Sequence, residues 1–328
     1  MTATNIWEMT TNSSPLNTGG ISQGAWEMGP IYKVALIPAG KQFTYTEMLT
    51  PYATLQALIE NNNPALRAYV IGDFVDAESI GQAETTGTTG YGLPTYEREG
   101  TIAIKLMWSR GGMTYEKVLK SLQGMQDAYD LIIFDRDTNS IIGAVPGDNS
   151  SSYVLRGFDL SQLYSPTITL PDGKKRTGHS LVIGLSDTDQ FTKRHKPIQL
   201  DPVKYPLMDL NSLINLEINP GKASGSPFTA TTVRLKLTTS DEKIDLYATY
   251  GAAFVALAAS CSAITDSTGA ALTISSLALH PATKSILCTF ASPTAANATV
   301  TFFSPTVAQM KAGSMAGFGN TSVQLTAV

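Results

Sequence analysis

The side chains best suited to binding a metal ion lie in Asp135-Arg136-Asp137-Thr138-Asn139, which resembles the opening of a calcium loop. In such a loop, carboxylate and amide oxygens at alternate positions coordinate the ion. The pattern then fails, because Ser140 stands where the loop needs glycine and Pro146 stands where it needs glutamate. We therefore expect an ordinary hairpin turn here.

Other patterns that could carry chemistry are also incomplete. The segment Gly87-x-x-Gly90-x-Gly92 lacks the Gly-Lys-Ser/Thr ending of a phosphate loop, so a threonine-rich contact loop is expected. No Gly-x-Ser-x-Gly nucleophile motif occurs. The histidines have no partners at ligand spacing, and structural roles are expected for His179, His195 and His280. The sequence predicts neither a metal nor a cofactor, and it does not predict an enzyme.

Charged and aromatic side chains of the kind found at interfaces gather in two segments. In a strand, Glu97 and Glu99 would point to one face and Arg98 to the other. They form a paired-acid site, a solvated group or an ion-pair cluster between subunits, and the last is favoured. Aromatic residues, which pack in cores or at interfaces, accompany them. The candidate inter-subunit contacts are Trp7, Trp26, Tyr91, Tyr96, Glu97, Arg98 and Glu99.

Composition indicates a folded protein without electrostatic affinity for nucleic acid. Hydrophobic residues make up 43% of the chain, charged residues 15%, and the net charge is −4. The densest basic run, Lys174-Lys175-Arg176, follows a Pro-Asp-Gly turn and is expected to be a solvated hairpin tip. No apolar stretch approaches the ~18 residues that span a bilayer. The N-terminus lacks a secretory signal pattern, which predicts synthesis in the cytoplasm.

Charge density changes sharply along the chain. Residues 219–328 carry ten charged side chains, and the preceding part carries forty. A stretch rich in Gly, Ser and Pro at 219–227 is a linker by composition, so we predict domains at 1–218 and 228–328. Cys261 and Cys288 lie in the second domain. They form a disulfide or remain two reduced core thiols, and the second alternative is favoured.

The first domain is predicted to be an α+β antiparallel β-sandwich with two helices. Apolar residues at helical spacing indicate helices at 46–61 and 114–123. The longest irregular segment is expected at 76–100, a length typical of functional loops. Strands are predicted at 32–37, 67–74, 101–108, 131–134, 141–145, 153–160, 167–170 and 180–185.

The second domain is predicted to be an immunoglobulin-like β-sandwich, which makes the chain mainly β. Around seven short strands separated by turn residues support this fold, although the usual Cys…Trp…Cys arrangement is absent. These strands are expected at 231–237, 243–249, 254–258, 271–274, 286–290, 298–303 and 322–326.

Three stretches resemble those of bacteriophage virion structural proteins. They are the Gly/Thr loop followed by Thr95-Tyr96-Glu97-Arg98-Glu99-Gly100, the helix-then-hairpin run 115–145, and the pattern at 266–274 with 280–285. More narrowly, the chain is similar to major tail (tail-tube) proteins with a C-terminal bacterial Ig-like domain.

This resemblance implies a homo-oligomer that forms hexameric rings stacked around a lumen. DNA would pass through the lumen as non-specific cargo, and the long loop and N-terminal arm would join neighbouring rings. The family has no catalytic residues. It implies contacts with other virion proteins, no membrane span, and a place in the virion after synthesis in the host bacterial cytoplasm.

Two alternatives remain open. The first is a capsid-decorating or head-fibre protein whose Ig-like domain attaches to host or surface glycans. The second is an enzyme, such as a hydrolase with an accessory binding domain. The enzyme is disfavoured because the sequence has no clustered acid, base or nucleophile.

Overall fold

The computed structural model describes residues 4–5, 29–82, 85–88, 94–98, 100–108, 113–146, 153–166, 178–220, 231–239, 243–295 and 298–326. At 4–5, 85–88, 94–98 and 113–115 it describes the backbone alone. The chain divides into two compact units, each described by itself. Unit 1 comprises Met1–Ile59 and Asn63–Ser212, and unit 2 comprises Glu60–Asn62 and Leu213–Val328. The protein is mainly β with antiparallel sheets and a few helices, as predicted.

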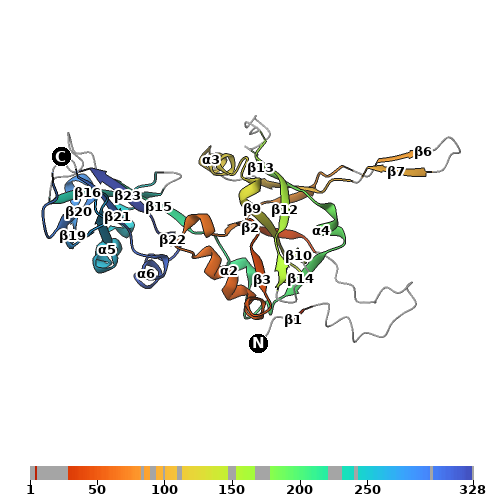
Figure 1. The fold of residues 1–328 in the computed structure, drawn as a ribbon, viewed down its shortest axis with the longest axis horizontal. Coiled ribbons are helices and arrows are strands. Elements are labelled where there is room, and N and C mark those ends of the chain that lie inside the picture. Colours follow the sequence, from red (N-terminus) through yellow and green to blue (C-terminus); the bar gives the residue numbers. More distant parts are fainter. Residues whose placement is uncertain are drawn as a thin grey trace. The chain divides into compact units, whose positions relative to one another are not determined.

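Unit 1 is built on one twelve-stranded sheet (Figure 1). Its strands are β1 (Thr4–Asn5), β2 (Ile31–Pro38), β3 (Gln42–Thr44), β4 (Tyr69–Ile71), β5 (Asp76–Ser79), β8 (Ala103–Trp108), β9 (Tyr129–Asp135), β10 (Ser140–Ala144), β11 (Tyr153–Arg156), β12 (Phe158–Tyr164), β13 (His179–Leu185) and β14 (His195–Gln199). The main path runs β1-β14-β10-β9-β12-β13-β8-β5. Off this path, β2 joins β9 to β4, and β11 joins β10 to β3.

Strand β9 is the centre of this sheet because both of its faces are apolar. Its run Leu131–Phe134 is completely buried, and it pairs with β2, β10 and β12. The predicted hairpin with β10 is confirmed, and Asn139 turns it with a φ of 48°. Strand β8 alternates buried and half-buried residues, as expected of a strand covered on one face.

Both predicted helices of unit 1 are confirmed. The first is split into the 3₁₀ turn η1 (Glu47–Leu49) and α2 (Pro51–Ile59), since Pro51 occupies the first helical position. The second is α3 (Met113–Ser121), whose buried Leu119 packs into the main core. A short helix, α4 (Thr188–Thr192), was not predicted. Its start is marked by Asp187, whose side chain accepts the Asp189 amide.

The prediction of an irregular segment at 76–100 is wrong. The structure has β5 there, followed by a hairpin of β6 (Thr85–Thr88) and β7 (Pro94–Arg98). Threonine is β-branched and favours strands, so the run interpreted as a loop has good strand propensity. The predicted strand at 67–74 shortens to β4, and the predicted strand at 167–170 lies outside the described residues.

Unit 2 contains a five-stranded and a four-stranded sheet that share one core. The first has the order β19-β20-β16-β15-β22 and the second β18-β17-β21-β23. Residues from both, such as Leu235 and Phe302, are completely buried in this core. The strands are β15 (Ile214–Pro220), β16 (Thr232–Thr239), β17 (Ser262–Thr265), β18 (Ala271–Leu272), β19 (Ile274–His280), β20 (Ser285–Phe290), β21 (Thr299–Phe303), β22 (Phe318–Gly319) and β23 (Ser322–Thr326).

Two strands predicted in unit 2, at 243–249 and 254–258, are wrong. The chain forms helix α5 (Tyr247–Ala256) there, and the turn η5 (Ala258–Ser260) follows it. The segment is rich in alanine, the best helix former, and buried Phe254 anchors it to the core. Helix α6 (Val307–Ala312) was not predicted. Cys261 is half-buried, Cys288 is buried, and their thiols are not bonded to each other.

Along the chain, unit 1 ends at Ser212 and the main part of unit 2 begins at Leu213, before the boundary predicted at residue 218. Asn219 and Pro220, which were predicted to belong to the linker, are part of β15. This strand pairs with β16 and buries Leu216 and Ile218 in the core of unit 2. The rest of the predicted linker, 221–227, lies outside the described residues.

Candidate assembly surface

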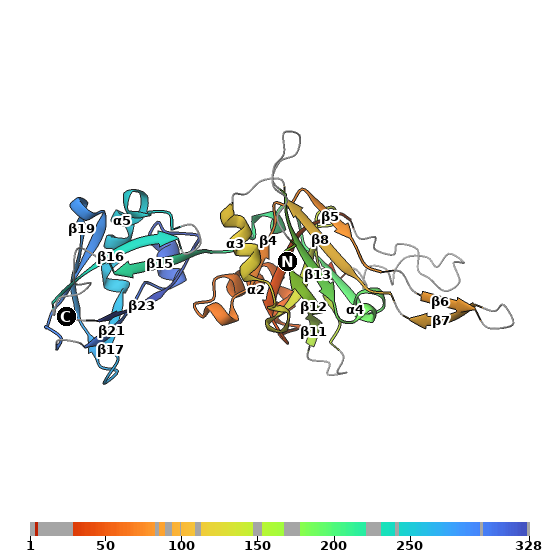
Figure 2. The ribbon, with the colours of Figure 1, turned by 90° about the horizontal axis from the view of Figure 1, so that it is seen from above.

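The β6–β7 hairpin is inserted between two neighbouring strands of the main sheet. β5 and β8 pair with each other on either side of the insertion, but β6 and β7 form a separate ladder. Among the strands that the structure describes, they pair only with each other. Figure 2 shows them beyond the ends of β5 and β8. An isolated two-stranded hairpin is marginally stable in water, so this element is suited to packing against another surface.

The base of the hairpin is fixed by backbone pairing. The Ile80 amide donates to the Ala103 carbonyl (2.9 Å), and the Thr101 amide donates to the Gln82 carbonyl (2.9 Å). The Thr101 hydroxyl also accepts the Gln82 amide at 3.0 Å. Gly81 lies so close to the opposite chain that an added Cβ would be 1.8 Å from the Thr101 carbonyl oxygen. Only glycine permits this close approach, so residues 80–82 and 101–103 continue the β5–β8 ladder into the insertion.

The structure describes only part of the predicted contact set. Tyr96, Glu97 and Arg98 lie on β7, where the backbone is described and the side chains are not. Register places Arg98 opposite Thr85 and Tyr96 opposite Thr86. The remaining predicted contacts lie outside the described residues: Trp7, Trp26, Tyr91 and Glu99. Gly81 and Thr101 were not predicted from the sequence, although an isolated glycine can mark a close approach of two backbone segments.

The N-terminal arm contributes one described strand to the main sheet. Thr4 pairs with Gln199 and Asn5 with Ile198, so β1 lies on the outer edge of β14. The next residue of β14 in this direction is Pro197, which has no amide hydrogen to donate. The described ladder ends at that point. Strand addition to an edge is a common way to join segments or chains.

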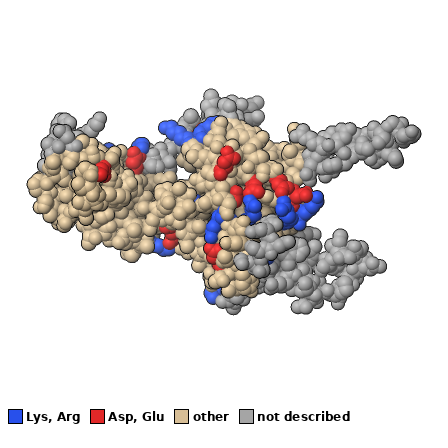
Figure 3. Space-filling view, in the orientation of Figure 1, with Lys and Arg blue, Asp and Glu red and all other residues tan. Residues whose placement is uncertain are grey.

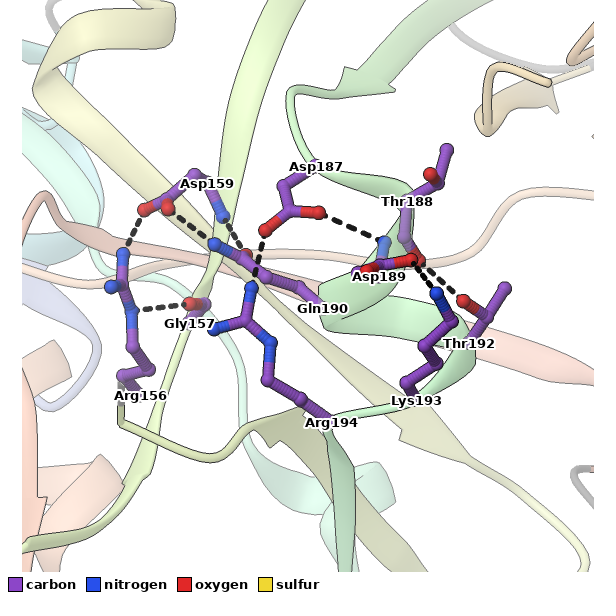
Figure 4. A network of polar contacts seen from close by, with 10 residues as sticks. All are labelled: Arg156, Gly157, Asp159, Asp187, Thr188, Asp189, Gln190, Thr192, Lys193 and Arg194. Atoms are coloured by element: carbon purple, nitrogen blue, oxygen red, sulfur yellow. Dashed lines mark hydrogen bonds and ion pairs between the residues drawn. The ribbon is translucent and has the colours of Figure 1, made fainter. Parts of the chain in front are cut away.

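A network of polar contacts holds α4 against the sheet (Figure 4). Gln190 is buried, accepts the Asp159 amide at 2.9 Å and donates to the Asp159 carboxylate, which also pairs with Arg156. On the outer side of the helix, Asp187 pairs with Arg194, and Asp189 pairs with Lys193 at 2.8 Å. These charges are paired with one another, which suits an ordered surface better than acid–base catalysis.

One buried carboxyl group beside this network has a perturbed pKa. Asp130 of β9 is 4% exposed, and its carboxylate accepts the Gly40 amide at 2.9 Å. Burial raises its pKa to about 6, and the negative charge of Asp159 contributes in the same direction. Asp159 is its direct cross-strand partner on β12. The Asp130 carboxyl group therefore changes its charge close to neutral pH. It lies within the sheet and bonds to the backbone of Gly40.

The calcium-like segment forms a hairpin turn, as predicted. Asp135 accepts the amides of Gly29 (2.8 Å) and Asp137 (2.9 Å). The Asn139 side chain donates to the Leu200 and Tyr205 carbonyls. These side-chain oxygens and amides are therefore already engaged in hydrogen bonds within the protein. Within the described part of the chain, no group of three potential ligands is placed to hold a metal ion.

Two of the histidines have structural roles, as expected. The His179 ring is buried, and its Nδ1 lies 2.9 Å from the Glu116 carboxylate, which joins β13 to α3. The same carboxylate accepts the Ser165 hydroxyl at 3.3 Å. The Nδ1 atom of His280 lies 2.7 Å from the Thr283 hydroxyl at the end of β19. His195 lies on β14.

Charged side chains are distributed unevenly over the protein. On the face drawn in Figure 3, lysine, arginine, aspartate and glutamate gather mainly over unit 1, and unit 2 is mostly uncharged. This agrees with the low charge of residues 219–328. Comparison with protein-family models and with curated proteins gives no match to this chain. Among the described residues, none of the helices combines the length and apolar character needed to cross a bilayer.

Proposed function

We propose that this protein is a self-assembling phage virion structural protein, a tail-tube or ring component that forms a conduit for DNA. The observation that carries the proposal is the β6–β7 hairpin, which pairs with no described strand of its own subunit. The edge of β14 carries β1 of the same chain, and exchange of this N-terminal arm between copies would provide a second contact. Both features suit contacts between copies of one chain in a closed ring.

In this proposal, unit 1 forms the ring and unit 2 is an Ig-like attachment. Paired sheets with a shared core support an Ig-like assignment, while α5 and α6 are additions to the simplest form of that fold. A hexameric ring and stacking of rings through the hairpin follow from the resemblance to tail-tube proteins. The weakly negative net charge suits a conduit from which DNA must be released.

The hairpin can be removed without disturbing the sheet that carries it. Gln82 and Thr101 face each other at its base, so a two-residue Asn-Gly turn in place of 83–100 should close the ladder. We expect this shortened protein to remain folded by circular dichroism and to lose only the contacts that the hairpin makes. Negative-stain microscopy should show rings or tubes for the full chain and none for the variant.

A matched control keeps the length of the hairpin and changes only its tip. Replacing Thr89 and Gly90 by Ser and Asn preserves β6, β7 and the candidate contact Tyr91, and it should retain assembly. Equal assembly by the shortened and full-length proteins would contradict the proposal.

The second candidate is a capsid-decorating or head-fibre protein that attaches to glycans through unit 2. The low charge of unit 2 is the observation that favours it, since neutral polar surfaces suit neutral sugars. Under this alternative, removing unit 2 abolishes attachment to the particle or cell surface. Under the tail-tube proposal, the same truncation leaves assembly intact.

A further inference from the structure

The outer edges of the main sheet are protected in three ways. On β5, the Asp76 side chain accepts the Ala77 amide at 2.9 Å, and Asp76 and Glu78 add negative charge. On β4, the Ser212 hydroxyl accepts the Val70 amide (2.6 Å) and donates to the Val70 carbonyl (3.0 Å). The edge of β14 carries β1 and then Pro197. Charges, proline and side-chain caps are the usual means of preventing unwanted strand pairing.

Strand β19 is an end strand of the five-stranded sheet in unit 2, and no residue in the described part of the chain protects its outer edge in these ways. The side to which each β19 amide points can be worked out from the hydrogen bonds of its neighbour β20. Alternate residues of β20 bond to β16 and to β19. Phe290 donates to Thr231 on the β16 side, so Ser285, Leu287 and Thr289 face β19. Their partners His280, Ala278 and Ser276 therefore face inward. Leu277 and Leu279 direct their backbone amides and carbonyls outward.

No described group bonds to the backbone amide or carbonyl of either leucine. Leu277 is 7% exposed and Leu279 is 44% exposed. Backbone groups at such positions need water or another strand as a partner. Residues 267–283 contain no Asp, Glu, Lys or Arg, so the strand itself carries no charge that would repel an incoming strand. A strand of this kind is an acceptor for strand addition.

The regular part of this edge is short and symmetric about one residue. A register shift between Ile274 and Ser276 ends it on one side, and Pro281 ends it on the other. The remaining segment, 276–280, has Ala278 at its centre. Two such segments, placed antiparallel about a two-fold axis at Ala278, would pair Leu277 of each copy with Leu279 of the other. This arrangement satisfies both outward amides and both outward carbonyls of each copy.

We propose that β19 of unit 2 pairs antiparallel with β19 of a second copy of this chain, on a two-fold axis through Ala278. The occupant is a second copy because the edge is self-complementary in spacing and uncharged throughout. Ser276 and Ala278 have exposed, small side chains, which allow two strands to approach without steric conflict. The contact would merge the two five-stranded sheets into one continuous sheet. It is separate from the hairpin contact of unit 1.

Cysteine cross-linking of the full chain tests this register. On the proposed axis, the two Ala278 side chains face each other in a non-hydrogen-bonded pair, with Cβ atoms close enough for a disulfide. We expect Ala278→Cys to form a covalent dimer with a mild thiol oxidant such as diamide, as seen on a non-reducing gel. Ser276→Cys is the matched control: it has the same face and exposure, but its partner is His280 of the other copy. It should cross-link roughly tenfold less.

The unmodified chain gives the background from Cys261 and Cys288. Equal cross-linking of the two variants would overturn the register. A disulfide formed mainly with a different protein in place of a second copy would overturn the choice of occupant. The Ala278→Cys reaction should be unchanged when the Asn-Gly turn replaces 83–100. Failure of the hairpin proposal is therefore distinguishable from failure of this one.

A second pair of variants tests the backbone contact itself. Leu279→Pro removes one outward amide hydrogen, whereas Leu279→Ala shortens the same side chain and keeps that hydrogen. In the hairpin-shortened background, sedimentation velocity should show weaker self-association for Leu279→Pro than for Leu279→Ala. Circular dichroism checks that both are folded. Equal self-association of two folded variants would count against the proposal, and the cross-linking result stands if the proline variant unfolds.

Discussion

Gly81 controls the point at which the hairpin leaves the sheet. A Cβ at this position would lie 1.8 Å from a backbone oxygen, so the chain would have to move. We predict that Gly81→Ala costs about 1–3 kcal/mol in the free energy of unfolding, measured with urea. Assembly should be lost with it, because the paired base of the hairpin would be pushed apart.

Gly178→Ala is the control for this prediction, because an added Cβ there meets no atom of the described residues within 4 Å. It should change the free energy of unfolding by less than about 0.5 kcal/mol. If Gly81→Ala were as stable as Gly178→Ala, the backbone at the hairpin base could move apart without a loss in the free energy of unfolding, which would contradict the prediction.

Asp130 makes stability depend on pH. Burial raises its pKa from the ordinary value of 3.8 to about 6, so the folded state binds its proton more tightly than the unfolded state does. The resulting stabilisation is complete below pH 3.8 and is lost as pH rises through about 6. Asp130→Asn removes the ionisation and leaves an oxygen to accept the Gly40 amide. We expect it to stabilise the protein by about 2 kcal/mol at pH 7.5.

Thermal unfolding from pH 4 to pH 8 measures this difference. The gap between Asp130→Asn and the unmodified chain should shrink as pH falls and be absent near pH 4. A gap of constant size across this range would mean that the substitution acts through packing and not through ionisation.

At the level of elements, α6 begins with a complete capping box. The Thr306 hydroxyl accepts the Gln309 amide at 3.3 Å, and the Gln309 side chain accepts the Thr306 amide at 2.9 Å. Thr306→Ala leaves a helix amide without its partner and should cost about 1 kcal/mol, measured by chemical unfolding. Thr306→Ser keeps the oxygen and should cost much less. If both variants lost the same free energy of unfolding, the contribution of Thr306 would come from its methyl group and not from its hydroxyl.

The same element shows what the sequence could have predicted. Thr306-x-x-Gln309 is a recognisable helix start, so α6 was within reach of sequence reasoning. α5 was harder, because residues 250–258 are apolar throughout and therefore show neither helical nor strand periodicity. Strongly patterned elements such as β8, α3 and the β9–β10 hairpin were predicted correctly.

Long-range pairing accounts for most of what the sequence did not reveal. β1 exists because the edge of β14 is available, and the two strands are almost two hundred residues apart in the chain. The hairpin base depends on the close approach of Gly81 to Thr101. The local sequence around either residue does not predict this contact. The open edge of β19 likewise follows from strand order within unit 2.

At the scale of the whole molecule, the position of the domain boundary decides how the chain can be divided. Lys33 donates to the carbonyls of Met208 and Leu210 and to the Asn211 side chain, and Ser212 bonds to β4. The last residues of unit 1 are therefore tied to its own strands. β15 begins directly afterwards and belongs to the core of unit 2.

We predict opposite outcomes for two truncations that differ by thirteen residues. A chain that ends at Ser212 keeps every one of these contacts, so it should be soluble and should still form rings or tubes by negative-stain microscopy. A chain that ends at Gly225 retains β15 without β16, which exposes Leu216 and Ile218 on an unpaired strand. It should aggregate, because such edges recruit other chains.

The soluble fraction after expression and size-exclusion chromatography distinguish the two truncated proteins. Equal solubility would contradict the assignment of β15 to unit 2. A folded but monomeric 1–212 chain, beside a full-length protein that assembles, would place the essential contacts in unit 2 and favour the decorating function. Assembly of the 1–212 chain would place them in unit 1, since β19 and its open edge would be gone while the hairpin and the β14 edge remained.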